Sequence, residues 1–389
     1  MGLIIQSIIV YGLIIAIMNY FGKIAYKKQY PQCFGGIDRF KNNKIGILTL
    51  FTKFYFVIPI FVFCLFAAIR YKVGVDCETY KQLFYEIQTF GSTQRREIEF
   101  GYNFLCNISN YLTGAHYLLF FLMALLQIGL YYYALRKHTY ILIFLSMALL
   151  FTNMYWSWMN GMRQNIAACA FVSIIPFIIN KKKWIYILLA VFIAMQMHKS
   201  ALIIIPISIT AYFLRNSIPN KYLQLGILAL CFLLMNKFNN LLESFSYLAM
   251  NAGYSMESIE SYTELEETTR TFGFRMILLY AVYIITIWFS NKMSKFCQSK
   301  EFNIWYNLHF IGICLSVLFY NNFTITRILY YFVIFTPIVT SMLLFYLHHY
   351  KKKQLFTIAI ILLVAGFLYT LYNSTGNMQT EAFLYKFDL

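Results

Sequence analysis

Apolar residues recur in long runs from one end of the chain to the other, with short polar stretches between them. A helix needs about 17–25 apolar residues to cross the hydrocarbon core of a bilayer, and the pattern predicts about twelve such segments. The predicted segments are residues 3–21, 46–69, 116–135, 140–156, 164–180, 184–197, 200–214, 222–237, 274–291, 302–320, 327–348 and 354–373. We therefore expect an all-α, polytopic membrane protein in which residues 1–389 form a single integral membrane domain.

Composition and charge favour a lipid bilayer, and not nucleic acid, as the partner of this chain. Of the 389 residues, 60% are hydrophobic and only 12% are charged, which excludes an ordinary soluble protein. The formal net charge of +17 arises mainly from lysine and arginine in alternate connections between the segments. These connections are residues 22–45, 136–139, 181–183, 215–221, 292–301 and 349–353. Because basic residues are retained on the cytoplasmic side, this distribution needs no nucleic acid and predicts that both termini are external.

Two connections on the predicted external side are long, at residues 70–115 and 238–273. They carry most of the acidic residues, whereas the predicted cytoplasmic connections are short and basic. Long connections on one side of a protein commonly carry its function. We therefore expect the functional site to face outside.

A polar stretch at residues 154–165 interrupts the apolar pattern on the same predicted side. It contains Arg163 among amides and aromatic residues, and an ionisable group near membrane depth marks a candidate functional site. Trp156 and Trp158 are expected to anchor the stretch at the membrane interface.

Several cations lie at the predicted external ends of segments, against the usual charge gradient. They are Arg70, Arg163, Arg275 and Arg327, together with His198 at the tip between two short segments. Arginine binds phosphate through paired hydrogen bonds, so these side chains predict a pyrophosphate site. The simpler alternative is that each boundary arginine reaches toward lipid headgroups.

Two carboxylates in the first long connection, Asp76 and Glu99, are candidates for a general base or for orienting a sugar hydroxyl. His198 competes with them for the role of base. The alternatives are a hydrated loop for the two carboxylates and a buried structural histidine for His198.

The order and spacing of short motifs in this chain resemble the EpsG/Wzy-type family of bacterial polysaccharide polymerases. The motifs are Arg70 with Gly74, Asp76 and Tyr80; Glu99, Gly101 and Tyr102; Gly161 to Gln164 with Ala167; His198 with Ser200 and Pro206; and Arg327 with Tyr331. The resemblance extends over residues 65–335. It implies an architecture similar to the GT-C glycosyltransferases and the O-antigen ligases.

The resemblance also implies an activity at the outer face of the bacterial plasma membrane. Such proteins join repeat units of O-antigen, capsule or exopolysaccharide carried on undecaprenyl pyrophosphate. A hydroxyl of a lipid-linked acceptor attacks the anomeric carbon of the donor chain, and lipid pyrophosphate leaves. A regulator of chain length is an expected partner.

The candidate site residues divide by expected role. We assign the pyrophosphate to Arg163 and Arg327, with Arg275 or Arg70 as a third contact. Sugar contacts are expected from Gln164, Asn160, Tyr80 and Tyr102. The external loops hold no DxD-like acidic pair, so we expect no metal ion and no cofactor.

Other classes of membrane protein remain as alternatives. A flippase for the same lipid-linked oligosaccharide would more often carry charges at mid-span positions around a central cavity. An O-antigen ligase would share the external arginines and differ in its acceptor. A membrane O-acyltransferase would need a histidine reached from the cytoplasm, where His138, His348 and His349 lie beside basic clusters.

Overall fold

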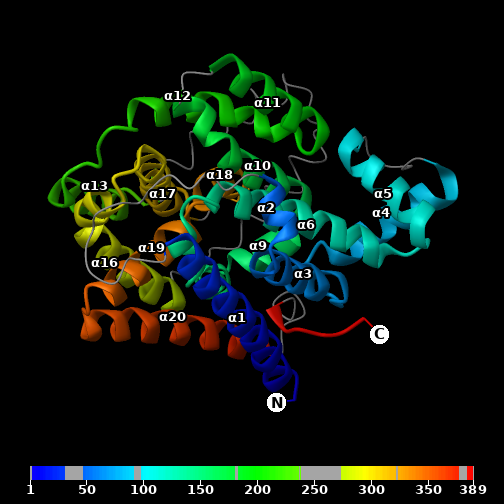
Figure 1. Ribbon diagram of the computed structural model, residues 1–389, viewed down its shortest axis with the longest axis horizontal. Coiled ribbons are helices and arrows are strands. Elements are labelled where there is room, and N and C mark those ends of the chain that lie inside the picture. The colour runs from blue at the N-terminus through cyan, green and yellow to red at the C-terminus, as the bar shows by residue number, and fades with distance from the viewer. Residues whose placement is uncertain are drawn as a thin grey trace.

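The computed structural model describes residues 2–30, 47–91, 98–179, 183–235, 237, 273–320, 323–375 and 383–388. These residues form helices, with no strand among them beyond an isolated antiparallel bridge between Arg70 and Phe387. Figure 1 shows a helical bundle from which the α4–α5 pair projects at one side. The all-helical class predicted from the sequence is therefore confirmed over the described ranges.

The described helices follow one another along the chain. The first half comprises α1 (Gly2–Gln29), α2 (Ile47–Thr52), α3 (Phe54–Ala68), α4 (Cys77–Phe90), α5 (Phe100–Thr113), α6 (His116–Leu135), α7 (Thr139–Leu142), α8 (Leu145–Phe151), α9 (Met154–Asn160) and α10 (Met162–Ile179). The second half comprises α11 (Lys183–Gln196), the 3-10 helix η1 (Lys199–Ile203), α12 (Ile204–Phe213), α13 (Lys221–Leu233), α16 (Phe274–Cys297), α17 (Lys300–Leu318), α18 (Phe323–Val333), α19 (Thr336–His349) and α20 (Lys353–Asn373).

Within the described ranges, six helices are long and apolar enough to cross a membrane. They are Gly2–Gln29, His116–Leu135, Met162–Ile179, Phe274–Cys297, Arg327–His349 and Lys353–Asn373, and four shorter apolar helices accompany them. The chain is thus a multi-pass membrane protein. This count does not confirm the prediction of about twelve membrane segments. That number and the GT-C-like architecture remain expectations.

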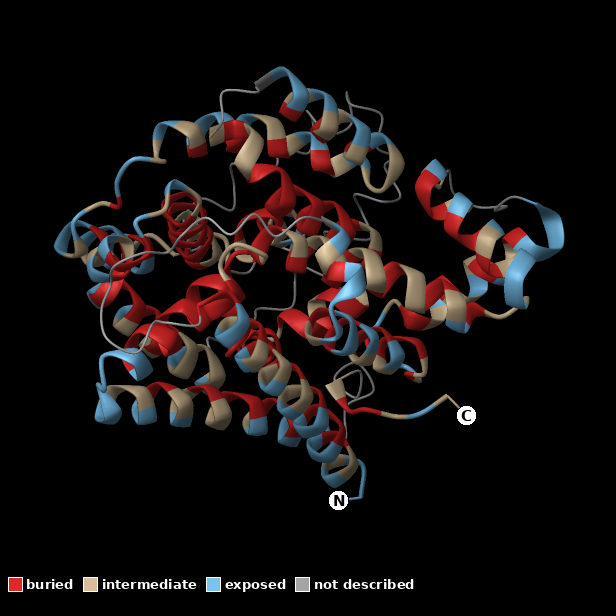
Figure 2. Cartoon of the chain, in the orientation of Figure 1, coloured by how far each residue is buried: buried red, intermediate tan, exposed pale blue. Residues whose placement is uncertain are grey.

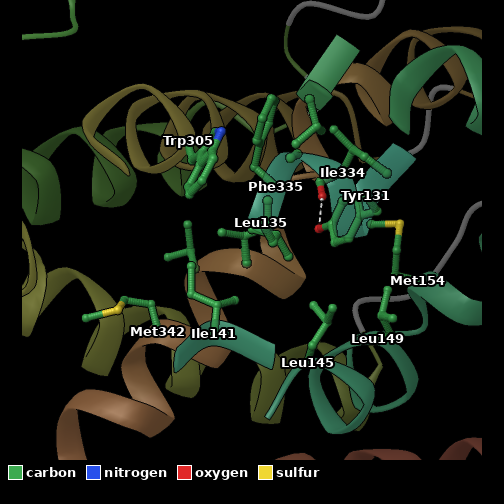
Figure 3. Packing of buried hydrophobic residues seen from close by; sticks show 14 of the residues in the cluster. Tyr131, Leu135, Ile141, Leu145, Leu149, Met154, Trp305, Ile334, Phe335 and Met342 are labelled. Atoms are coloured by element: carbon green, nitrogen blue, oxygen red, sulfur yellow. Dashed lines mark hydrogen bonds between the residues drawn. The ribbon is translucent and has the colours of Figure 1, made fainter. Parts of the chain in front are cut away.

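Three of the predicted segments are broken into shorter helices. Residues 140–156 form α7, α8 and part of α9, and Asn153 between α8 and α9 has the left-handed φ of 63° that ends regular helix. The 46–69 segment divides at Lys53, whose backbone is extended. The 327–348 segment divides between α18 and α19, where the hydroxyl of buried Tyr131 donates to the carbonyl of Ile334 at 2.7 Å (Figure 3). That bond satisfies a carbonyl exposed by the break.

Burial separates the centre of the bundle from its rim. Helices α10 and α19 are buried along most of their length, whereas α1 and α20 keep one exposed face (Figure 2). The exposed faces of these peripheral helices are apolar, as lipid contact requires. The centre therefore lies around α10, the helix that carries Arg163 in its first turn.

The two ends of α1 mark two ends of the molecule. Near its start, Ser7 accepts from the backbone N–H of Tyr385 at 2.8 Å, so the tail returns to this end (Figure 1). At its other end, the Gln29 side chain donates to the carbonyl of Arg136, and the hydroxyl of Tyr30 donates to that of Lys137. The basic connection at residues 136–139 and the tail, which pairs with Arg70, therefore lie at opposite ends of α1.

The first long connection is largely helical. Residues 70–115 contain α4 and α5, which pack against each other as an antiparallel pair. Gly91 ends α4 with a φ of 71°, a conformation that glycine adopts without steric cost. The second long connection, predicted at residues 238–273, lies outside the described residues except for Gly273.

Candidate active site

Two glycines let the α4–α5 pair dock closely against the bundle. A Cβ at Gly74, whose φ is +88°, would lie 2.7 Å from the carbonyl oxygen of Met159 in α9. A Cβ at Gly101 would collide with the carbonyl oxygen of Gln196 at the end of α11. Glycine is therefore needed at both points for backbone to approach backbone. These contacts bring the stretch before α4 next to the end of α9, and α5 next to the end of α11.

Arg163 lies in the first turn of α10 and meets the start of α5. Its Nη1 donates to Oε2 of Glu99 in an ion pair. Its guanidinium carbon lies 5.5 Å from the ring centroid of Tyr102, a cation–π distance. The Arg163 backbone N–H donates to the hydroxyl of Tyr80, and Tyr102 donates to the carbonyl of Tyr80 at 3.2 Å. Arg163 is thus held by both helices of the projecting pair.

One donor of Arg163 is buried without a hydrogen-bond partner in the described structure. This donor is Nε, the guanidinium nitrogen nearest the backbone. A buried polar group left unpaired costs about 1–3 kcal/mol, and more when it is charged. Such a donor marks a place where a bound acceptor would be stabilising.

His198 lies at the tip between α11 and η1, as predicted. Its backbone is extended, with a φ of −163°, and its side chain caps η1 by accepting from the backbone N–H of Ser200. The Ser200 hydroxyl is 2.6 Å from Nδ1 of His198 and 3.0 Å from the hydroxyl of Tyr331 in α18. These contacts fix the imidazole between η1 and α18.

Arg327 lies in α18 with an exposed side chain. Its backbone carbonyl accepts from Nε2 of Gln164 at 2.6 Å, which ties α18 to the first turn of α10. Asn160 makes a similar link, since its Oδ1 accepts from the backbone N–H of Asp76 at 2.9 Å. The two amides predicted to contact sugar therefore also join the elements of the site.

Charges from three other elements act on His198. Burial lowers its pKa, the Glu99 carboxylate raises it, and Arg163 and Arg327 lower it further, giving about 4. The imidazole is consequently neutral at pH 7. The Arg163–Glu99 ion pair, the bond of Gln164 to the Arg327 carbonyl and the Ser200–Tyr331 bond join the elements concerned, so four residues from separate segments lie in one neighbourhood. They are Arg163, Glu99, His198 and Arg327, hereafter the charged cluster.

The comparison with known families agrees with this arrangement. The model of the EpsG family matches residues 53–387, a range that contains the whole charged cluster. This chain belongs to the EpsG family. No curated protein and no solved structure matches it. The family resemblance inferred from the motifs is thus confirmed.

Arg70 of this EpsG-family protein is placed away from the charged cluster. Its side chain has no exposed surface and bonds to the carbonyl of Ala67, the carbonyl of Val73 and, at 3.1 Å, the sulfur of Met162. The guanidinium also lies 4.3 Å from the ring centroid of Phe120. Arg70 thus joins its own connection to Met162 at the beginning of α10.

Arg275 is also separate from the charged cluster. It lies in the first turn of α16, and its side chain packs beside Gly366 of α20. Of the four arginines predicted to contact pyrophosphate, the structure brings Arg163 and Arg327 together.

The expectation that two tryptophans anchor the polar stretch at the membrane interface is wrong. Trp158 has no exposed surface and packs against Phe63 and Tyr131. Trp156 is 3% exposed, and its indole N–H donates to the hydroxyl of Tyr11 at 2.9 Å. Both side chains face the protein core because α9 lies inside the bundle.

Two features of the site region were not predicted. One is the contact between Ser200 and Tyr331. Its only sequence signal is the His–x–Ser spacing, which is typical of a capped turn. The other is the bond of tail residue Asp388 to Lys81 and His116, for which the sequence offers no local signal.

A pocket of about 450 Å³ opens along α4, and no residue of the charged cluster is among its described lining residues. The described lining residues are Glu78, Lys81, Gln82, Tyr85, Glu86, Thr89 and Phe90.

Proposed function

We propose that this protein is a glycosyltransferase that polymerises undecaprenyl-pyrophosphate-linked oligosaccharide repeat units at the external face of the bacterial plasma membrane. Its place in the EpsG family supports a role in polysaccharide synthesis. The observation that carries the proposal is the charged cluster, in which two arginines, a carboxylate and a neutral imidazole meet at one end of a multi-pass bundle.

The arginines suit the leaving group of this reaction. Lipid pyrophosphate is anionic, and negative charge builds on its bridging oxygen as the bond to the anomeric carbon breaks. Arg163 offers a buried, unpartnered Nε and Arg327 an exposed guanidinium. Positive groups held in place before the reaction stabilise the transition state more than the ground state. In the proposed site, these guanidinium groups supply the charge stabilisation for departure.

The acceptor side of the site needs a group that receives a proton. The acceptor hydroxyl oxygen forms the new bond to the anomeric carbon, the bond to pyrophosphate breaks, and the hydroxyl proton passes to a base. His198, Asp76 and Glu99 are the candidates from the sequence. Glu99 also orients Arg163 through the ion pair. The free ends of the Asn160 and Gln164 amides, Nδ2 and Oε1, are the proposed sugar contacts.

The polymerase proposal is tested by reconstitution with one lipid-linked repeat unit. The purified protein in liposomes is given the undecaprenyl-pyrophosphate-linked repeat unit, without nucleotide sugar. A ladder of longer lipid-linked products supports polymerisation. Movement of the lipid across the bilayer without a ladder indicates the alternative flippase. Transfer only after addition of a different acceptor lipid indicates a ligase, and adding a candidate chain-length regulator tests the proposed partner.

A further inference from the structure

The backbone amide of Ser200 determines which ring nitrogen of His198 carries a proton. A backbone N–H can only donate, and the Ser200 N–H points to Nδ1 of His198 at 3.3 Å. Nδ1 must therefore present its lone pair, so the single proton of the neutral ring is on Nε2.

The same constraint gives a direction to the two hydroxyl groups behind the ring. Ser200 Oγ, at 2.6 Å, must donate to the unprotonated Nδ1 of His198. Its oxygen then accepts from the hydroxyl of Tyr331 at 3.0 Å, because the serine has no second proton to give. Tyr331 is fully buried, which keeps its end of this chain of bonds away from water.

We propose that Ser200 and Tyr331 are positioning residues that hold His198 as an Nε2–H donor to the pyrophosphate of the lipid-linked substrate. This inference rests on the polymerase function proposed above. It removes His198 from the candidates for the base, because its only lone pair faces Ser200. The proton of the acceptor hydroxyl then passes to a carboxylate, Asp76 or Glu99. The depressed pKa of His198, about 4, agrees with a ring that stays neutral while it works.

The tautomer can be measured without any substrate. Solid-state NMR of ring-¹⁵N-histidine protein in lipid at pH 7 distinguishes the two nitrogens, and the signal absent from the His198→Gln variant identifies residue 198. We expect a protonated Nε2 and an unprotonated Nδ1. A proton on Nδ1, or on both nitrogens, would overturn the inference and leave the proposed polymerase function untouched.

Amide substitutions test the role of the Nε2 proton in the reaction. The side-chain amide of Gln reaches the place of Nε2 and can donate there, whereas that of Asn reaches only the place of Nδ1. With the purified lipid-linked repeat unit in proteoliposomes, we expect His198→Gln to keep about a tenth of the wild-type kcat. We expect His198→Asn and His198→Ala to lose about 100–1000-fold, as for other lost transition-state donors. Equal loss in all three folded variants would show that His198 is not a donor.

Variants of the two hydroxyl groups test positioning separately. Ser200→Ala and Tyr331→Phe should lower kcat about tenfold, with little change in KM, and Ser200→Thr should restore most of it. Tyr186→Phe is the matched control, since Tyr186 is also buried and its hydroxyl bonds to Ser208. An unchanged kcat in Ser200→Ala and Tyr331→Phe would contradict the positioning role. If no variant or wild-type protein forms ladders while the tautomer is as expected, the proposed polymerase function fails instead.

Discussion

Arg163 at the start of α10 is ion-paired with Glu99 at the start of α5, and the pair joins the central helix to the projecting helical hairpin. The two side chains are only 21% and 10% exposed. Removing one member of such a pair leaves a poorly solvated charge, so substitution has larger effects here than at a surface ion pair. The pair therefore fixes one positive charge at the proposed pyrophosphate site.

Arg163→Ala should abolish polymer formation while leaving insertion into the membrane intact. The substitution removes the unpartnered Nε and the paired Nη1 together, and we expect a loss of at least about 100-fold in ladder formation. The assay is product length in proteoliposomes, with protein amount in the membrane measured in parallel. Arg136→Ala is the control, because Arg136 lies at the opposite end of α1, where its backbone carbonyl accepts from Gln29, and its guanidinium bonds to the carbonyl of Tyr133. Normal ladders from Arg163→Ala would remove Arg163 from the site.

Glu99→Gln should be less damaging than Glu99→Ala. Gln keeps an oxygen that accepts from Arg163, although the bond loses the contribution of the negative charge. We expect a loss in kcat/KM of about tenfold for Gln and about 100-fold for Ala. Steady-state kinetics on both variants give the comparison. Equal and complete loss in the two variants would instead show that Glu99 is the base that takes the hydroxyl proton.

Gly101→Ala should reduce activity although no side chain of the charged cluster is altered. The added Cβ collides with the carbonyl of Gln196, which is backbone and cannot rotate away, so the end of α11 must move. His198 follows two residues later, and a displacement of about 1 Å is enough to cost on the order of 100-fold in rate. Gly129→Ala is the control, since a Cβ there meets nothing within 4 Å. Full activity of Gly101→Ala would show that this close approach does not position His198.

Arg70→Met tests whether Arg70 acts in stability or in chemistry. Methionine fills similar space but leaves the carbonyls of Ala67 and Val73 without their buried donor, at a cost of about 1–3 kcal/mol each. We expect a lower thermal unfolding temperature and less protein, with near-normal activity per folded molecule. Light scattering and tryptophan fluorescence during heating give the first quantity, and the ladder assay the second. A stable but inactive variant would restore Arg70 to the pyrophosphate site.

The sequence was informative where a physical rule acts along the chain. Apolar run length indicated membrane helices, and the charge of the connections placed Arg163, Arg327, Glu99 and His198 on one side. These four are also the residues that the structure brings together. The side of the membrane on which a residue is predicted limits its position along the bundle axis. For these four residues, that limit was enough to group them correctly.

The rest depends on which face of a helix a residue occupies, and sidedness does not determine that. Arg70 lies at the same end as Arg163, yet it turns inward to the carbonyls of its own connection. Trp158 looked interfacial because of its place in the chain, but α9 is surrounded by protein. The break at Asn153 depends on a left-handed backbone that periodicity does not reveal. Contacts of the tail join residues hundreds of positions apart, beyond any local signal.

The tail should stabilise the projecting helix pair in a pH-dependent manner. Asp388 bonds to Lys81 of α4 and, at 3.1 Å, to Nε2 of His116 at the start of α6. Burial acts to raise the Asp388 pKa, but the bonds from Lys81 and His116 outweigh it and hold the pKa below its usual value. A carboxylate with a lowered folded-state pKa contributes stability above its unfolded pKa, near about 3.9, and this contribution is lost as the pH falls through the folded value. Asp388→Asn should therefore unfold about 2 °C below wild type at pH 7.

The difference between Asp388→Asn and wild type should shrink as the pH is lowered below about 4, because the wild-type carboxyl then becomes neutral as well. Thermal unfolding in lipid nanodiscs, recorded in parallel for the two proteins across the pH range, measures it. Lys386→Gln is the control, since it changes the charge of the tail while leaving Asp388 and its partners in place. The Lys386 backbone carbonyl still accepts from the N–H of Tyr71. A stability difference that is the same at pH 3 and pH 7 would show that the charge of Asp388 does not hold the tail, and that its contact with α4 and α6 is one of packing alone.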